Sequence, residues 1–172
     1  MALEIFPQKP PQFLLQKSLI SALRGSIGSL AYQNLYMVFD DKEIDILNGG
    51  QYSCGLFVST ILRRFSSDSQ KRVLLKEMHS TVASTIKDMQ ECGWYAIEDL
   101  RPGAIVEWEG QENEHHVGFK DYHIGFCSDE NHAISSSARK LCIIEHDIHQ
   151  RDSETGDVRP IKAIWWHDAL NS

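Results

Sequence analysis

Cys54 is the residue of this chain whose position best suits covalent chemistry. It follows the pair Gly49-Gly50 and opens the segment CGLFVSTIL, in which apolar residues recur at helical spacing. The first amides of a helix have no partner within the helix, and the helix dipole is positive there. We therefore expect a lowered thiol pKa, a nucleophilic thiolate, and free amides able to hold an oxyanion. Gly55 is expected to leave room for a substrate beside the sulfur.

The three other cysteines lie in positions that favour structural roles. Cys92 follows the end of a predicted helix, where the dipole disfavours a thiolate. Cys127 and Cys142 lie in predicted strands among apolar neighbours. No two cysteines have the close spacing of a zinc knuckle, so we expect at least three free thiols and a reducing compartment.

A cysteine nucleophile needs an imidazole to take its proton and return it to the leaving group. His123 is the best candidate, because His123-Ile-Gly-Phe reads as a strand in which Gly125 leaves space beside the ring. His116, in the similar run His116-Val-Gly-Phe, is the rival.

The third member of such a site fixes the imidazole tautomer through the other ring nitrogen. A turn over residues 128–131 would return the chain beside His123 and bring either Ser135 or His132 to the ring. These two residues have opposite parity along a strand, so only one can face the site. Tyr52 and Ser53 are expected to line the oxyanion side and the cleft, and Glu107 to Glu109 can contribute near it.

The elements expected to position these residues change in character along the chain. Residues 12–39 read as helix, broken into two at Gly25 or Gly28, and two further helices are expected over residues 53–65 and 68–91. Short β-prone runs then follow, at 104–108, 116–119, 122–127, 132–136, 142–148 and 161–166. Helices followed by strands predict an α+β fold in which N-terminal helices pack on a C-terminal antiparallel sheet.

Four segments resemble the NlpC family of cell-wall peptidases, in family order. YSCGLFVS resembles its nucleophile motif, and the run from Asp99 to Trp108 resembles its leucine–proline–glycine strand. His123-Ile-Gly-Phe resembles its histidine strand, and the run from Ala133 to Ser137 resembles the strand of the third polar residue. The resemblance spans about half the chain. Two positions depart from the family: Ser53 stands where an Asp is usual, and Ser135 where His, Asn or Gln is usual. Because an ungapped match to the family spacing puts Ser135 at the third position, the resemblance favours Ser135 over His132.

The resemblance implies a single papain-like domain over residues 1–172 and a cysteine peptidase, or thiol protease. Such a hydrolase would cleave amide bonds, those of peptidoglycan stem peptides in the cell wall, through a Cys–His acyl-enzyme. It would need no cofactor and no metal, and its partner would be a peptide or muropeptide substrate.

Composition and charge argue against two classes of partner, nucleic acids and a membrane that the chain would span. The formal net charge of −7 argues against a nucleic-acid partner. There is no run of 18 apolar residues for a membrane span. The N-terminus, interrupted by Pro7, Pro10 and Pro11, shows no secretory signal. We therefore expect a cytoplasmic protein or one exported by a non-standard route. The oligomeric state is not predicted.

Three alternatives remain open from the sequence. The first is a zinc site using His146 and His149, although residues 142–148 read as a strand and would separate the rings. The second is a binding or regulatory module that keeps the fold without turnover. The third is a Cys–His acyltransferase or amidase acting on a substrate other than peptidoglycan.

Overall fold

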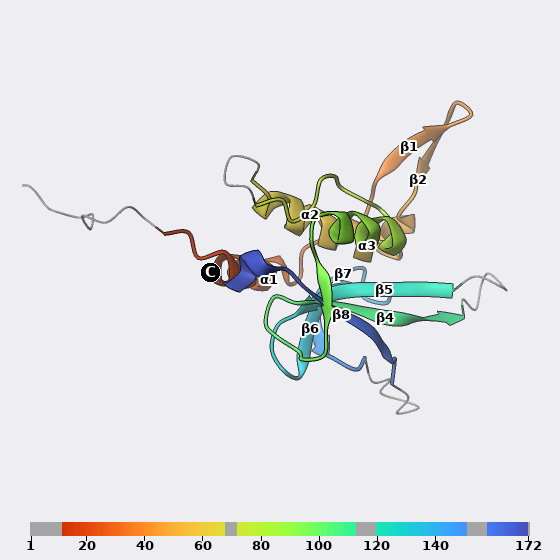
Figure 1. Ribbon diagram of the computed structural model, residues 1–172. Coiled ribbons are helices and arrows are strands. Elements are labelled where there is room, and N and C mark those ends of the chain that lie inside the picture. The colour runs from red at the N-terminus through yellow and green to blue at the C-terminus, as the bar shows by residue number, and fades with distance from the viewer. Residues whose placement is uncertain (1–11, 68–71, 113–119, 151–157, 172) are drawn as a thin grey trace, which may run out of the picture.

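A computed structural model describes residues 12–67, 72–112, 120–150 and 158–171. Within them a helical layer lies over one antiparallel sheet, in which the strands follow the order β3-β8-β4-β5-β6-β7 (Figure 1). This confirms the predicted α+β class. The helices are α1 (Leu15–Ser26), α2 (Cys54–Phe65) and α3 (Val82–Glu91), with short 3-10 turns η1 (Asn48–Gly50) and η3 (Asp168–Asn171). The sheet strands are β3 (Tyr95–Ile97), β4 (Ile105–Glu112), β5 (Lys120–Cys127), β6 (His132–Ser137), β7 (Cys142–Asp147) and β8 (Ile161–Trp166).

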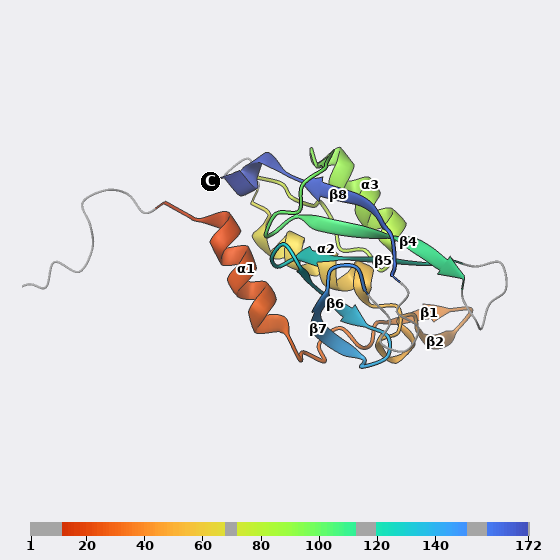
Figure 2. The same cartoon turned by 90° about the horizontal axis from the view of Figure 1, so that it is seen from below.

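The core forms where α2 packs on β5 and β6. Phe57 of α2 meets Phe126 of β5 edge to face, with ring centroids 5.8 Å apart. The helix α1 adds Leu15, Leu19 and Leu23, which are buried and recur every four residues along one face. Figure 2 shows α1 at one end of the sheet and a separate hairpin, β1 (Tyr36–Phe39) with β2 (Lys42–Asp45), at the other. Among the described residues, no helix has the length and apolar character needed to cross a membrane.

The strands β5 and β6 separate along their length, and this shapes the site. β5 pairs with β4 along most of its length, including Trp108 opposite His123. Its pairing with β6 is confined to Phe126 opposite Ile134 and Cys127 opposite Ala133. The β5 edge on the β6 side is therefore not covered by β6 at residues 122–124, and the start of α2 lies there.

The prediction of a second helix before residue 39 is wrong, because residues 29–35 form turns and irregular backbone and Tyr36–Phe39 is β1, the first strand of the hairpin. Asp40 and Asp41 have φ values of 47° and 59°. Two successive left-handed residues form the tight turn that suits the twist of a hairpin. The short run Tyr-Met-Val-Phe, which is rich in β-formers, was the available signal.

The prediction of a helix over residues 68–91 is only partly right, because α3 begins at Val82. The Thr81 hydroxyl accepts a hydrogen bond from the Ser84 amide and caps the helix there. The preceding segment is held irregular by Asp88, whose carboxylate accepts the amides of Lys76 and Glu77 and the His79 Nε2.

Most strand predictions are confirmed to within a few residues, and β3 was not predicted. The expected strand over residues 116–119, and with it the rival base His116, lies outside the described residues.

Candidate active site

The loop that leads into Cys54 is organised by the carboxylate of Asp45. Its Oδ1 accepts the amides of Leu35 (2.9 Å) and Leu47 (3.1 Å), and its Oδ2 accepts the amide of Gly49 (2.8 Å). These hydrogen bonds, that of Gly49 first, lower the Asp45 pKa to about 2. Asp45 thus connects the end of the hairpin to the turn before the nucleophile candidate.

That turn uses backbone conformations that favour Asn and Gly. Asn48, Gly49 and Gly50 all have positive φ. An added Cβ on Gly50 would lie 3.3 Å from Gln33, so the turn also packs closely. Ser53 is buried, and its hydroxyl donates to the Gly50 carbonyl (2.9 Å). The side chain of Ser53 therefore holds the turn, and it caps no amide of α2.

Cys54 is the first residue of α2 and is partly exposed. Its sulfur lies against the β5 edge, where it contacts the Tyr122 carbonyl at 3.9 Å and interacts with the Ile124 amide. These two groups flank His123 in the chain. The structure thus brings the Cys54 sulfur to the strand that carries the predicted base.

Gly55 serves helix packing and not substrate access. A Cβ at this position would lie 2.8 Å from the Thr81 carbonyl carbon and 3.0 Å from Ser80. The space beside Gly55 is therefore occupied by the backbone that precedes α3, which corrects the expected role of this glycine.

Burial raises the pKa of the Cys54 thiol above its ordinary value. The amides of Ile124 and Gly55 and the charge of Arg159 act in the opposite direction, as expected for a helix start, but they do not outweigh burial. The expectation of a lowered thiol pKa for Cys54 is therefore wrong. The sulfur is a neutral thiol at rest and needs a base to become a nucleophile.

The other cysteines lie in structural positions, away from the start of α2. All four cysteines are free. Burial, with a hydrogen bond to Asp88, raises the pKa of Cys92 to about 11, and burial raises that of Cys127 to about 11. Cys92 is the residue that caps the C-terminus of α3, and Cys127 is buried in β5.

His123 and Ser135 meet as the ungapped spacing predicted. His123 Nε2 and Ser135 Oγ are 2.8 Å apart, and Ser135 is only 1% exposed. Gly125 permits this approach, since its Cβ would lie 2.7 Å from the Ser135 Cβ. The alternative third residue, His132, instead bonds Asp129 in the turn between β5 and β6.

His146, which the sequence did not assign to the site, and Trp108, one of the expected cleft residues, complete the surroundings of the ring. Ser135 Oγ also lies 2.8 Å from His146 Nε2 on β7, and His146 Nδ1 lies 2.8 Å from the Asp147 carbonyl. The ring of Trp108 packs beneath both imidazoles, with centroids 5.2 Å from His123 and 5.7 Å from His146.

Trp108 is itself fixed in place. It is fully buried, and its indole Nε1 donates to the Ile148 carbonyl (2.8 Å). Glu107, its neighbour, instead accepts from Lys162 (2.6 Å) and from Trp165 (3.1 Å). Of the expected cleft residues 107 to 109, Trp108 is the one whose side chain touches the histidine.

Arg159 supplies a buried positive charge near both reactive groups. Its Nε donates to the Glu109 carbonyl (2.8 Å) and its Nη2 donates to the Asp121 carbonyl. Burial, then the charge of Arg159 and that of His146, lower the pKa of His123 well below its ordinary value. The imidazole is therefore neutral, and able to accept a proton, at neutral pH.

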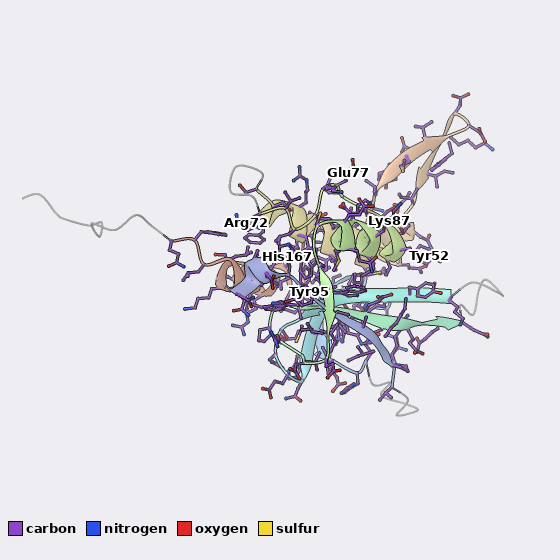
Figure 3. All side chains as sticks on the ribbon, in the orientation of Figure 1. Tyr52, Arg72, Glu77, Lys87, Tyr95 and His167 are labelled. Carbon is purple, nitrogen blue, oxygen red and sulfur yellow. The ribbon has the colours of Figure 1, made fainter. Side chains whose placement is uncertain are left out.

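Tyr52 lies just before the helix and is 39% exposed. Figure 3 shows it at the edge of the helical layer nearest β5. It remains a candidate for contact with a bound substrate.

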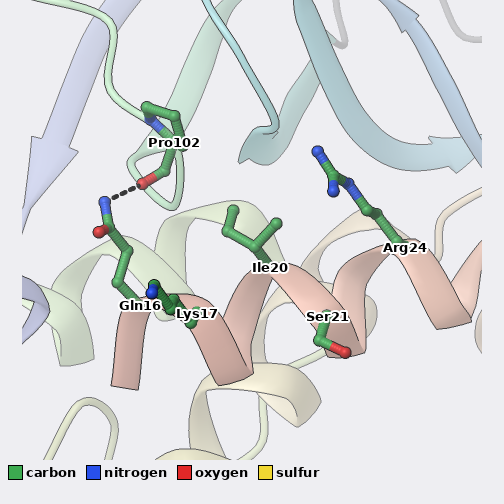
Figure 4. A pocket seen from close by; sticks show the side chains of 6 residues that line it. All are labelled: Gln16, Lys17, Ile20, Ser21, Arg24 and Pro102. Atoms are coloured by element: carbon green, nitrogen blue, oxygen red, sulfur yellow. Dashed lines mark hydrogen bonds between the residues drawn. The ribbon is translucent and has the colours of Figure 1, made fainter. Parts of the chain in front are cut away.

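A separate hollow lies between α1 and the loop that carries Pro102, lined by Gln16, Lys17, Ile20, Ser21, Arg24 and Pro102 (Figure 4). Gln16 donates to the Pro102 carbonyl across it (2.8 Å). Gly103, next to Pro102, bonds to Cys127 at the far end of β5 from Cys54. This hollow is therefore not part of the candidate site.

The zinc alternative gains no support within the described ranges. No group of three or more His, Cys, Asp or Glu side chains is arranged there to hold a metal ion. His146 lies in a strand and uses both ring nitrogens within the protein.

Comparisons with known proteins add no relative. No family model matches the chain, and neither the curated proteins nor the solved structures include a significant match.

Proposed function

We propose that this protein is a papain-like cysteine hydrolase that cleaves amide bonds through a Cys54–His123 acyl-enzyme. The observation that carries the proposal is the position of the Cys54 sulfur, at the start of α2 and against the two β5 peptide groups that flank His123. The Ser135 contact at Nε2 of His123 supports it, because a third group that orients the imidazole is the usual companion of such a pair.

In the proposed reaction, His123 Nδ1 takes the proton of the Cys54 thiol as the sulfur attacks the amide carbonyl. The first amides of α2, at Cys54 and Gly55, stabilise the resulting oxyanion. The imidazolium then gives its proton to the leaving amine, which departs and leaves a thioester on Cys54. A water molecule, deprotonated by the same imidazole, hydrolyses the thioester and regenerates the thiol.

The proposed substrate is a peptidoglycan stem peptide or a muropeptide. This part of the proposal rests on the resemblance of four segments to the NlpC family. It is compatible with a site that sits at the molecular surface, since both Cys54 and His123 are partly exposed.

The experiment is digestion of purified peptidoglycan and soluble muropeptides, with products identified by mass spectrometry. Wild-type protein is expected to release new amine and carboxyl termini, and Cys54→Ala is expected to release none. Cys142→Ala is the matched control and should cleave like wild type, since Cys142 is the first residue of β7, opposite Ser137 at the end of β6. Absence of cleavage by the wild type would remove the peptidoglycan assignment.

A further inference from the structure

The Ser135 hydroxyl lies between two imidazoles, and this arrangement constrains where the protons are. Ser135 Oγ is 2.8 Å from His123 Nε2 and 2.8 Å from His146 Nε2. These side chains come from three adjacent strands, β5, β6 and β7, and share one face of the sheet. A hydroxyl has a single proton to donate, so it can donate to only one of the two rings.

The Asp147 carbonyl determines which ring receives that proton. A carbonyl oxygen only accepts, so His146 Nδ1, at 2.8 Å from it, must carry a hydrogen. A neutral His146 then has a bare Nε2, which accepts the Ser135 hydroxyl proton. Ser135 Oγ in turn accepts the Nε2–H of His123. The bare nitrogen of His123 is thereby Nδ1.

We propose that His146 is a positioning residue that, through Ser135, holds His123 in the Nε2-protonated tautomer and leaves Nδ1 as the base for Cys54. Its catalytic meaning rests on the proposed function, whereas the tautomer itself is a property of the free protein. The serine at the third position is thus one link in a relay that ends on the imidazole of the next strand.

The surroundings of His146 favour the neutral form that this relay needs. Burial lowers the pKa of His146. The Asp147 carbonyl and the charges of Asp147 and Glu145 on β7 raise it, and His132 on β6 lowers it. Trp108 on β4 and His123 on β5 pack against the ring. The net direction is downward, so His146 is uncharged at neutral pH.

Loss of the acceptor at His146 has a defined consequence. Without it, the other acceptor near the Ser135 hydroxyl is the Ser136 carbonyl, at 3.4 Å, which is a weak geometry. The hydroxyl can then donate to His123 Nε2 instead, which moves the ring proton to Nδ1 and removes the base that the proposed reaction uses.

The test measures the His123 tautomer by nitrogen-15 NMR in the free protein at neutral pH. Wild type is expected to show Nε2–H. His146→Leu is expected to shift the population toward Nδ1–H. His146→Gln, whose side-chain oxygen can accept from Ser135, is expected to restore Nε2–H. His149→Leu is the matched control, since His149 is an exposed histidine three residues away, and should match wild type.

Kinetics on a cleaved muropeptide provide the second readout. His146→Leu is expected to lower kcat/KM by about tenfold to a hundredfold, as loss of a group that orients an imidazole does elsewhere. The same substitution in a Ser135→Ala background is expected to have no further effect, because the relay is already broken.

An Nδ1–H tautomer of His123 in the wild type would overturn the inference without any variant. Equal tautomer populations in wild type and folded His146→Leu would also overturn it, even in an active enzyme. Failure of the wild type to cleave any substrate would instead count against the proposed function and leave the tautomer result standing.

Discussion

At the scale of single residues, the candidate site works with a neutral pair. Burial raises the pKa of the Cys54 thiol and lowers that of the His123 imidazole. Neither group is charged at rest, and the imidazole must take the thiol proton during attack. The positive charge of Arg159 acts on both groups, because it lowers the pKa of the Cys54 thiol and that of the His123 imidazole.

Replacement of Arg159 tests that electrostatic role. Arg159→Met removes the positive charge, so the thiol pKa rises and the alkylation of Cys54 by iodoacetamide at neutral pH should slow several-fold. Arg159→Lys keeps the charge and should slow it less. Peptide mass spectrometry gives the rate at each cysteine, and melting temperatures identify any variant that fails to fold. Alkylation of Cys54 at the wild-type rate in both folded variants would refute the role.

The residues of the site differ in how far sequence could predict them. Cys54 was marked by a glycine turn followed by an apolar helix, and Ser135 by its spacing from His123. His146 and Arg159 reach the site through hydrogen bonds to residues far away in the sequence. His146 bonds Ser135, 11 residues away, and Arg159 bonds the Asp121 carbonyl, 38 residues away. A one-residue change of register in β7 would turn His146 to the other face, and no local signal in the sequence fixes that register.

At the scale of elements, two glycines set how closely the parts of the site approach one another. Gly55 lets the backbone before α3 pack on the start of α2, and Gly125 lets Ser135 approach β5. In each case an added methyl group would lie within 3.0 Å of other atoms, a separation that requires something to move.

Gly125→Ala should therefore destabilise the sheet beside the site. The new Cβ would meet the Ser135 Cβ at 2.7 Å and the Ile134 carbonyl oxygen at 2.9 Å. Overpacking of this kind costs about 1–3 kcal/mol in the free energy of unfolding, measured by urea denaturation with tryptophan fluorescence. It should also displace Ser135 from His123.

Gly25→Ala is the control for this prediction. Gly25 lies within α1, and an added Cβ meets nothing within 4 Å. Alanine is the better helix former, so this variant should gain about 0.5–1 kcal/mol. A Gly125→Ala protein as stable as the wild type would show that the close packing of β5 on β6 is not required.

The elements themselves were predictable where one hydrophobic period dominated. The helix at 53–65 and the strands β4 to β8 fall close to their expected positions. The strand β1 was mistaken for helix and β2 was not predicted, because these four-residue strands are short and exposed and have no buried face to produce a period of two. The segment before α3 was mistaken because the Asp88 carboxylate, twelve residues ahead, holds its backbone.

At the scale of the whole molecule, the sheet partly buries two histidines in neutral form. The pKa values of His123 and His146 are lower in the folded state than in the unfolded chain. The unfolded state therefore binds more protons below about pH 6.5, and stability must fall as the pH decreases through that range.

The free energy of unfolding, from urea titrations, is accordingly expected to decrease from about pH 7 to about pH 5. A His123→Gln, His146→Gln double variant should lose much of this dependence, because it has no buried imidazole left at these positions. His149→Gln, at an exposed position, should retain it. A stability that stays constant or increases toward pH 5 in the wild type would contradict the burial of neutral imidazoles.

The most direct test of the Cys54–His123 pair is the pH dependence of Cys54 alkylation, followed by peptide mass spectrometry in wild type and His123→Ala. With His123 as base, the wild-type rate should form a plateau from acidic to mildly alkaline pH. Its acid limb should lie below the ordinary histidine range, because the pKa of His123 is lowered. In His123→Ala this plateau should disappear, leaving only the rise that accompanies thiol ionisation at high pH. Superimposable profiles for the two proteins would show that the imidazole does not act on the sulfur.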